Sequence, residues 1–196
     1  MKGLLLALLI LLPVIPVIPV MAGYDEAWEA YLNQDYATAM KQLKPLAEQG
    51  DPRSQYAVGW MYRNGEGVDQ DYKTTVKWYR LAAEQGHAEA QNSLGQMYQF
   101  GEGVASDNKT AVKWYRLAAE QGNAEAQNNL GQMYASGKGV ARDETIAYVW
   151  LYSAASQGVS LARWSQDRLE RIMSPEQLEQ AQAMALKCQA SNYKDC

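Results

Sequence analysis

His87 is the only histidine in the 196-residue chain and is therefore the first candidate for acid–base chemistry near neutral pH. No serine or cysteine nucleophile accompanies it in a recognisable motif. It directly follows Gly86, and the equivalent positions 36 residues before and after it hold Asp51 and Asn123. Aspartate and asparagine are preferred helix N-caps. We therefore expect His87 to cap a surface helix and not to act as a general base.

Other catalytic groupings are missing from the sequence. The acidic residues Glu84, Glu120 and Asp143 are dispersed along the chain, which is typical of solvated surface or helix caps and not of a carboxylate pair. There is no phosphate-binding loop, no dinucleotide fingerprint and no run with metal-ligand spacing. The sequence therefore favours a protein that is not an enzyme and that carries no cofactor and no metal.

Cys188 and Cys196 are the two cysteines, eight residues apart near the C-terminus. In an oxidising compartment, two thiols this close favour a local disulfide, and free thiols are the alternative. A C-x-x-C redox motif is absent. Two cysteines with one distant histidine also cannot build a zinc site.

Aromatic and amide side chains supply the chemistry of recognition. Tyr56, Trp60 and Arg63 share one helical face and are the residue types that dominate protein interfaces. The same positions 36 and 72 residues later hold amides and one alanine: Asn92, Gln96, Gln99, Asn128, Gln132 and Ala135. We expect this face to hold an extended segment of a partner protein, anchored by Tyr56 and Trp60. The alternative is that Trp60 packs against a shortened N-terminal unit and binds nothing.

The element that positions these residues is a repeat of 36 residues. Trp78, Trp114 and Trp150 keep this spacing. So do three series of glycines, namely Gly50, Gly86, Gly122 and Gly158; Gly59, Gly95 and Gly131; and the pairs Gly65/Gly67, Gly101/Gly103 and Gly137/Gly139. Such a period marks a solenoid, in which each unit buries its apolar face against its neighbours.

Each unit reads as two helices joined by a glycine-rich turn. In the middle unit, one helical stripe contains Ala90, Leu94, Met97 and Tyr98. Gly101 predicts a left-handed stop, and Asp107 predicts the N-cap of a second helix. Gly95 lies inside the first helix, where glycine costs about 1 kcal/mol relative to alanine. We expect it to let the indole of the second helix rest against bare backbone.

The ends depart from the pattern, as terminal units of a stack should. We divide the chain into a signal peptide at 1–22, a truncated N-terminal unit at 23–50, and full repeats at 51–86, 87–122 and 123–158. After Gly158 the 36-residue pattern is lost, and 159–196 is expected to form C-terminal capping helices. Ser174, Pro175 and Gln177 predict the start of a last helix that runs to about Ala190.

The unit resembles the Sel1-like repeat family. The matching residues are Ala90, Leu94-Gly95, Tyr98, Gly101, Gly103-Val104, Asp107, Trp114-Tyr115, Ala118-Ala119 and Gly122. The resemblance implies an all-α fold, a right-handed α/α superhelical solenoid related to tetratricopeptide repeats, used as an adaptor in protein complexes. Some cysteine-rich secreted relatives are associated with β-lactamase activity, but they carry paired cysteines in each repeat, which this chain lacks.

The N-terminus has the pattern of a secretory signal. Lys2 precedes an apolar or Gly/Pro stretch, and Val20 and Ala22 stand at −3 and −1 of a cleavage site before Gly23. The alternative is a retained membrane anchor, although the three prolines Pro13, Pro16 and Pro19 would break a spanning helix. We therefore expect export to the periplasm or secretion, with membrane contact only through an uncleaved segment.

Charge argues against nucleic acid as a partner, since the net charge is −4 and no basic stripe is present. The predicted function is an exported scaffold for protein–protein interaction. The alternatives are a β-lactam hydrolase and a module that binds cell-wall glycan.

Overall fold

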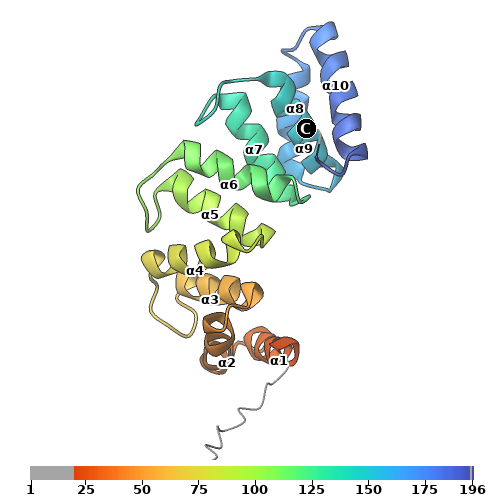
Figure 1. Ribbon diagram of the computed structural model, residues 1–196. Helices are drawn as coiled ribbons and strands as arrows, with labels where there is room; N and C mark the ends of the chain where they lie inside the picture. The colour runs from red at the N-terminus through yellow and green to blue at the C-terminus, as the bar shows by residue number, and fades with distance from the viewer. Residues whose placement is uncertain (1–19, 195) are drawn as a thin grey trace, which may run out of the picture.

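The computed structural model describes residues 20–194 and 196, and this part of the chain is helical with no strand. Its helices are α1 (Val20–Leu32), α2 (Tyr36–Glu48), α3 (Pro52–Asn64), α4 (Tyr72–Glu84), α5 (Ala88–Phe100), α6 (Asn108–Ala119), α7 (Ala124–Ser136), α8 (Glu144–Ser156), α9 (Ser160–Glu170) and α10 (Pro175–Ala190). They follow one another along a single stack (Figure 1). The predicted all-α solenoid is confirmed.

Each helix from α1 to α8 packs against the next one along the chain. We call α3, α5 and α7 the first helices of their units and α4, α6 and α8 the second helices. The helix α9 packs on α8 and touches α7, so it occupies the place of a further first helix. The last helix, α10, packs back on α8.

The N-terminal signal prediction falls largely outside the described residues. Residues 1–19 are not described, and residues 20–22 begin α1. Among the helices that are described, none has the length and apolarity needed to cross a membrane.

Side-chain caps start the helices where the sequence predicts. Asp107 accepts hydrogen bonds from the backbone N–H groups of Lys109 and Thr110, and Asp35 and Asp71 act in the same way on their own helices. The first helices end at glycines in the left-handed region, as at Gly101 with φ 74°. The predicted capping box of Ser174 and Gln177 is present at the start of α10.

Tyrosine, and not tryptophan, fills the notch over the helical glycines. A Cβ added at Gly95 would lie 2.7 Å from two ring carbons of Tyr115, and one added at Gly59 would meet Tyr79 at the same distance. In the third unit Leu151 takes this place over Gly131. The predicted close approach is therefore correct, but the prediction that the indole provides it is wrong.

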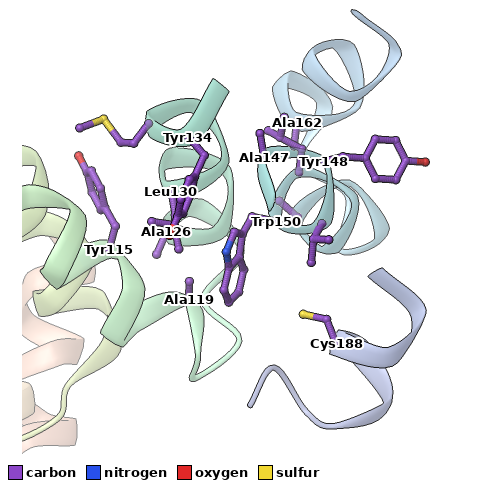
Figure 2. Close-up of a cluster of buried hydrophobic side chains, with 14 of the residues drawn as sticks. Tyr115, Ala119, Ala126, Leu130, Tyr134, Ala147, Tyr148, Trp150, Ala162 and Cys188 are labelled. Carbon is purple, nitrogen blue, oxygen red and sulfur yellow. The ribbon is translucent and has the colours of Figure 1, made fainter. Parts of the chain in front are cut away.

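The tryptophans pack against the preceding unit. Trp78 is partly buried against the cluster of α2 and α3, and Trp114 against that of α4 and α5. Trp150 is buried, with 3% of its surface exposed. Figure 2 shows its indole reaching from α8 toward Ala119. Each indole thus covers the junction with the preceding unit.

A row of buried glutamines, which we call the glutamine relay, links successive helix pairs. Gln91 is 4% exposed; its amide nitrogen donates to the carbonyl of Ala83, 3.0 Å away, and its amide oxygen accepts from Gln121 at 2.7 Å. The same bonds recur one unit earlier through Gln55 and Gln85, and one unit later through Gln127 and Gln157. Each buried amide therefore joins three helices with both of its polar atoms satisfied.

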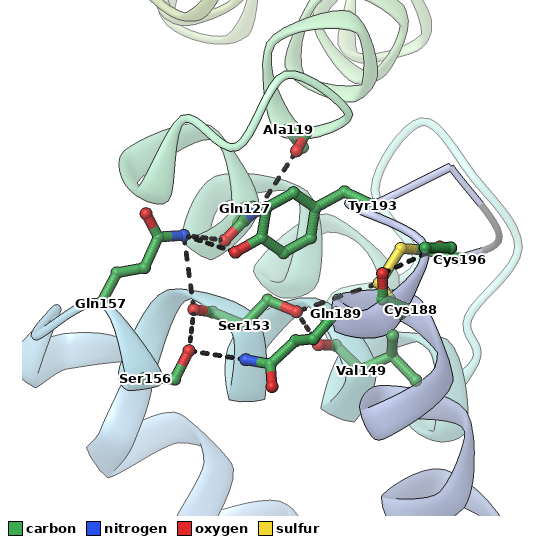
Figure 3. Close-up of a disulfide and its surroundings, with 11 residues drawn as sticks. Ala119, Gln127, Val149, Ser153, Ser156, Gln157, Cys188, Gln189, Tyr193 and Cys196 are labelled. Carbon is green, nitrogen blue, oxygen red and sulfur yellow. Dashed lines mark hydrogen bonds between the residues drawn. A yellow bond between two sulfur atoms is a disulfide. The ribbon is translucent and has the colours of Figure 1, made fainter.

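The C-terminal tail closes over this relay. Cys188 and Cys196 are joined in the structure by a disulfide with Cα atoms 4.8 Å apart, which matches the predicted pairing. Figure 3 shows Tyr193 lying across Gln157 and Gln127. The Gln157 amide donates to the Tyr193 hydroxyl at 3.5 Å, and the Tyr193 ring lies against Gly122. The tail is thus folded back onto the stack.

We predict that Gly95→Ala lowers the free energy of unfolding by about 1–3 kcal/mol, because the added methyl group collides with Tyr115. Helix propensity alone predicts the opposite sign, a gain of about 1 kcal/mol. Urea denaturation followed by circular dichroism measures the difference. In a Tyr115→Ala background the same substitution should no longer destabilise. A destabilisation of equal size in both backgrounds would contradict the notch.

We predict that Cys196→Ala lowers the free energy of unfolding by about 2–3 kcal/mol, because it opens a short loop that the disulfide closes. Dithiothreitol should cause a loss of the same size in the wild type and no further loss in the variant. A wild type that is insensitive to the reductant would show that the two thiols are not oxidised in the purified protein.

Candidate functional site

The first helices α3, α5 and α7 carry the residues predicted to bind a partner. Trp60 is 37% exposed, whereas Tyr56 and Arg63 are half-buried beside it. Tyr56 and Trp60 line the first of a row of hollows that lie along the first helices. We call this row of hollows the inner groove.

An aromatic cleft opens between α1 and α3. Its volume is about 270 Å³, and it is lined by Tyr24, Trp28, Tyr31, Tyr56, Ala57 and Trp60. The indole N–H of Trp60 donates to the Tyr31 hydroxyl at 2.9 Å, and that hydroxyl donates to Glu66 at 3.0 Å. Trp28 stacks on Tyr31 with ring centroids 4.9 Å apart. The rings are therefore held in place while part of their surface stays open.

Both expectations for Trp60 describe part of what the structure shows. Trp60 does contact the shortened N-terminal unit, through its hydrogen bond to Tyr31. It also keeps more than a third of its surface exposed, and Trp28 on the facing helix is 38% exposed. Packing has thus fixed the orientation of Trp60 without covering it.

Arg63 connects α3 to the next unit. Its guanidinium donates to Gln96 at 3.5 Å and forms an ion pair with Glu102 at 3.3 Å. Gln96 also lines a second hollow of about 250 Å³, which is bounded by Gln96, Gln99, Phe100, Tyr115, Asn128, Asn129, Gln132 and Leu161. Arg63 therefore contacts the second hollow through Gln96 and lines neither hollow itself.

The amide residues of the groove are partly used by the protein itself. Asn92 and Asn128 are buried, at 9% and 3% exposure, so they offer little accessible surface to a partner. Asn92 accepts a hydrogen bond from Asn129 at 3.0 Å, and Asn128 accepts one from Gln132 at 3.3 Å. Gln132 is exposed, and Gln96 is half-buried. These two are the amides best placed to meet a ligand.

Gln99 has a structural partner as well. The hydroxyl of Tyr115 donates to its amide oxygen at 2.5 Å. The residue pair at these positions is Arg63 with Tyr79 in the first unit and Ala135 with Leu151 in the third. Burial raises the pKa of the Tyr79 and Tyr115 hydroxyls, which keeps both rings neutral. Only the Gln99–Tyr115 pair is joined by a hydrogen bond, and the buried Tyr79 hydroxyl has no hydrogen-bond partner among the described residues.

His87 caps α5 as the sequence predicts. Its Nδ1 atom accepts a hydrogen bond from the backbone N–H of Ala90 at 3.3 Å. Its ring stacks on Tyr56 with centroids 5.1 Å apart, and it is partly buried. Desolvation lowers the pKa of His87 below its ordinary value of 6.5, with Arg53 acting in the same direction and the carboxylates of Glu89 and Asp51 opposing it.

Sequence reasoning missed the far end of the groove. Trp164 and Arg168 on α9 stand 36 residues after Asn128 and Gln132, and so belong to the same face. Together with Gln132 and Arg142 they line a third hollow of about 320 Å³. The 36-residue spacing could have revealed these two residues, because it continues into α9. It was obscured because Asp167 stands where the repeat would place a glycine.

Metal chemistry finds no support in the described residues. Across positions 20–194 and 196, no group of three or more His, Cys, Asp or Glu side chains is placed to hold an ion.

The stacked helix pairs and the groove along their first helices define a helical repeat solenoid. A Sel1 repeat model matches residues 52–87, 88–123 and 124–159, which together make up more than half of the sequence. The chain belongs to the Sel1 repeat family. The predicted family is thus confirmed, and each matched stretch begins one residue after the start of an expected repeat. Sel1 repeats generally mediate protein–protein interactions and typically serve as non-catalytic scaffolds.

Two solved structures are similar to this chain. A Sel1 repeat protein from Oxalobacter formigenes is 35% identical with a TM-score of 0.70, over 73% of this chain and 59% of that one. A protective antigen of uropathogenic Escherichia coli strains, which displays an SLR fold, is 39% identical with a TM-score of 0.71, over 75% of this chain and 32% of that one. This chain thus spans less than two thirds of either protein. No curated protein sequence matches it.

We predict that acidification destabilises the protein through His87. The folded state binds the His87 proton less tightly than the unfolded state does, so this contribution to stability is complete above about pH 6.5 and is lost as the pH falls below it. His87→Asn, which copies Asn123, should flatten the dependence of the urea midpoint on pH between neutrality and mild acidity.

The carboxylate caps do not titrate in the pH range in which His87 is expected to act. Hydrogen bonds from threonines lower the pKa of Asp35, Asp71 and Asp107 from an ordinary value of 3.8. Their contribution to the stability of the fold is therefore lost only at lower pH. An unchanged pH profile in the His87→Asn variant would show that His87 contributes nothing.

Proposed function

We propose that this protein is an exported scaffold whose inner groove holds an extended segment of a partner protein. The observation that carries the proposal is the aromatic cleft, in which Trp28 and Trp60 are held by contacts with Tyr31 yet keep over a third of their surfaces open. Exposed tryptophans held rigidly in a pocket are the usual anchors of protein interfaces.

The rest of the groove suits a peptide backbone. Gln132 is exposed and Gln96 is half-buried, so their amides can donate to and accept from a main chain without selecting its charge. Both line the middle hollow of the groove. Since the neighbouring amides and the Tyr115 hydroxyl are already bonded to one another, the groove is ordered before any ligand arrives, which lowers the entropic cost of binding.

Two observations support export. The structure brings Cys188 and Cys196 within disulfide distance, and disulfides persist in oxidising compartments. One similar structure is a protective antigen of uropathogenic Escherichia coli strains. We therefore place the scaffold in the periplasm or outside the cell, with the segment 1–22 removed as a signal peptide. Intact mass of the exported protein beginning at Gly23 would establish the cleavage.

We predict that Trp60→Ala weakens partner binding by at least about 30-fold, the loss typical of a hot-spot residue, while leaving the fold intact. The measurement is affinity capture from an exported fraction, followed by titration of the recovered partner with wild type and variant. The matched control is Leu81→Ala, which truncates an exposed apolar residue of α4 that lines no part of the groove.

The outcomes separate the candidate functions. Equal binding by Trp60→Ala and wild type would refute the groove as the site. Binding of isolated cell-wall glycan, lost in Trp60→Ala, would instead identify a glycan module, because aromatic faces also stack on sugar rings. Turnover of nitrocefin by the pure protein would identify a hydrolase.

A further inference from the structure

The inner groove ends in a second anchor on α9 that differs chemically from the aromatic cleft. Ala162 and Leu169 of α9 are buried at the positions that Ala126 and Met133 occupy in α7. This match shows that α9 lies in the register of a first helix. Trp164 and Arg168 consequently project from the face that carries Tyr56 and Trp60 at the other end of the groove.

The pocket at this end combines an aromatic wall with a cation. Its volume is about 320 Å³, and Trp164, Ser165, Arg168, Arg142 and Gln132 are among its lining residues. The Arg168 guanidinium lies over the Trp164 ring, 5.3 Å from its centroid. Stacking of this kind fixes the direction of the guanidinium and leaves its N–H donors free.

Only one of the two arginines is already neutralised. Arg142 forms an ion pair with Glu144 at 2.6 Å. For Arg168, the described part of the chain provides the cation–π contact with Trp164 and no ion pair. Trp164 is 58% exposed, so the stacked pair is open to solvent. The pocket therefore presents one uncompensated positive charge on a protein whose net charge is −4.

We propose that the Trp164–Arg168 pocket binds an acidic side chain of the same extended partner segment whose apolar or aromatic residue enters the cleft at Trp60. This inference rests on the proposed function and adds what the segment must contain. A guanidinium held against an aromatic face offers two parallel donors to a carboxylate. The fit is thus to aspartate or glutamate.

The two anchors lie at the two ends of one row of first helices. The Arg63–Gln96 hydrogen bond joins α3 to a residue of the middle hollow, and Gln132 lines both the middle hollow and the Trp164–Arg168 pocket. Three steps between neighbouring first helices separate α3 from α9, which is roughly 30 Å at the usual helix spacing. An extended chain covers this distance in about nine residues.

The test is a selection from phage-displayed random dodecapeptides on immobilised wild type, Arg168→Gln and Trp60→Ala proteins. Wild type should enrich peptides in which an apolar or aromatic residue and an acidic residue stand about eight to ten positions apart. Arg168→Gln should keep the aromatic preference and lose the acidic one. Trp60→Ala should do the reverse.

Fluorescence anisotropy then measures one selected peptide and the same peptide with glutamine in place of its acidic residue. Wild type should bind the acidic form about tenfold more tightly, a preference that falls as salt is added. Arg168→Gln should abolish this preference. The matched control is Arg163→Gln, which removes an exposed charge from α9 outside the pocket and should retain it.

The possible failures can be told apart. Selection of aromatic residues without acidic ones overturns the second anchor and leaves the proposed function standing, provided that Trp60→Ala removes the aromatic preference. An acidic preference that survives Arg168→Gln also overturns the second anchor. A wild-type selection with neither preference overturns this inference together with the peptide groove.

Discussion

The contact between a helical glycine and the ring facing it sets the geometry of the whole stack. At Gly59 and Gly95 the absence of a side chain lets a tyrosine ring rest on the backbone of the first helix, and Leu151 does the same over Gly131. This spacing fixes how closely the second helix approaches the first. Tyr115, seated on Gly95, also lines the middle hollow of the groove and donates a hydrogen bond to Gln99. The contact that seats the second helix therefore also shapes the wall of the groove.

Hydrogen bonds of buried side chains also hold successive units together. The glutamine relay ties every unit to the one before it through amides that are nearly inaccessible to solvent, such as Gln91 and Gln127. A buried amide left without partners would cost about 1–3 kcal/mol, so a shift of one unit against the next is penalised sharply. The solenoid is therefore held in one curvature, and the groove is a rigid surface and not one that forms only on contact.

The helix boundaries and the repeat could be predicted from the sequence, because they depend on residues that are close together in the chain. Caps such as Asp107 and His87, stops such as Gly101 and the start of α10 depend on residues within a few positions. The ring over Gly95 could not be assigned, since Trp114 and Tyr115 are adjacent on the same apolar face and periodicity does not say which one turns toward the glycine. The register of α9 was not recognised because Asp167 stands where the repeat has its glycine. The helix after α9, α10, packs on α8, so it seats no ring against α9 and no glycine is needed there.

The junctions between units are nearly interchangeable. Gly103 meets the backbone of Tyr72 as Gly139 meets that of Asn108, and the same amide bonds cross each boundary. An extra copy of residues 87–122 inserted between two units would find matching contacts on both of its sides. Gene duplication could therefore lengthen the array one unit at a time without redesigning its interior, so the number of residues spanned by the surface can evolve separately from the chemistry at its two ends.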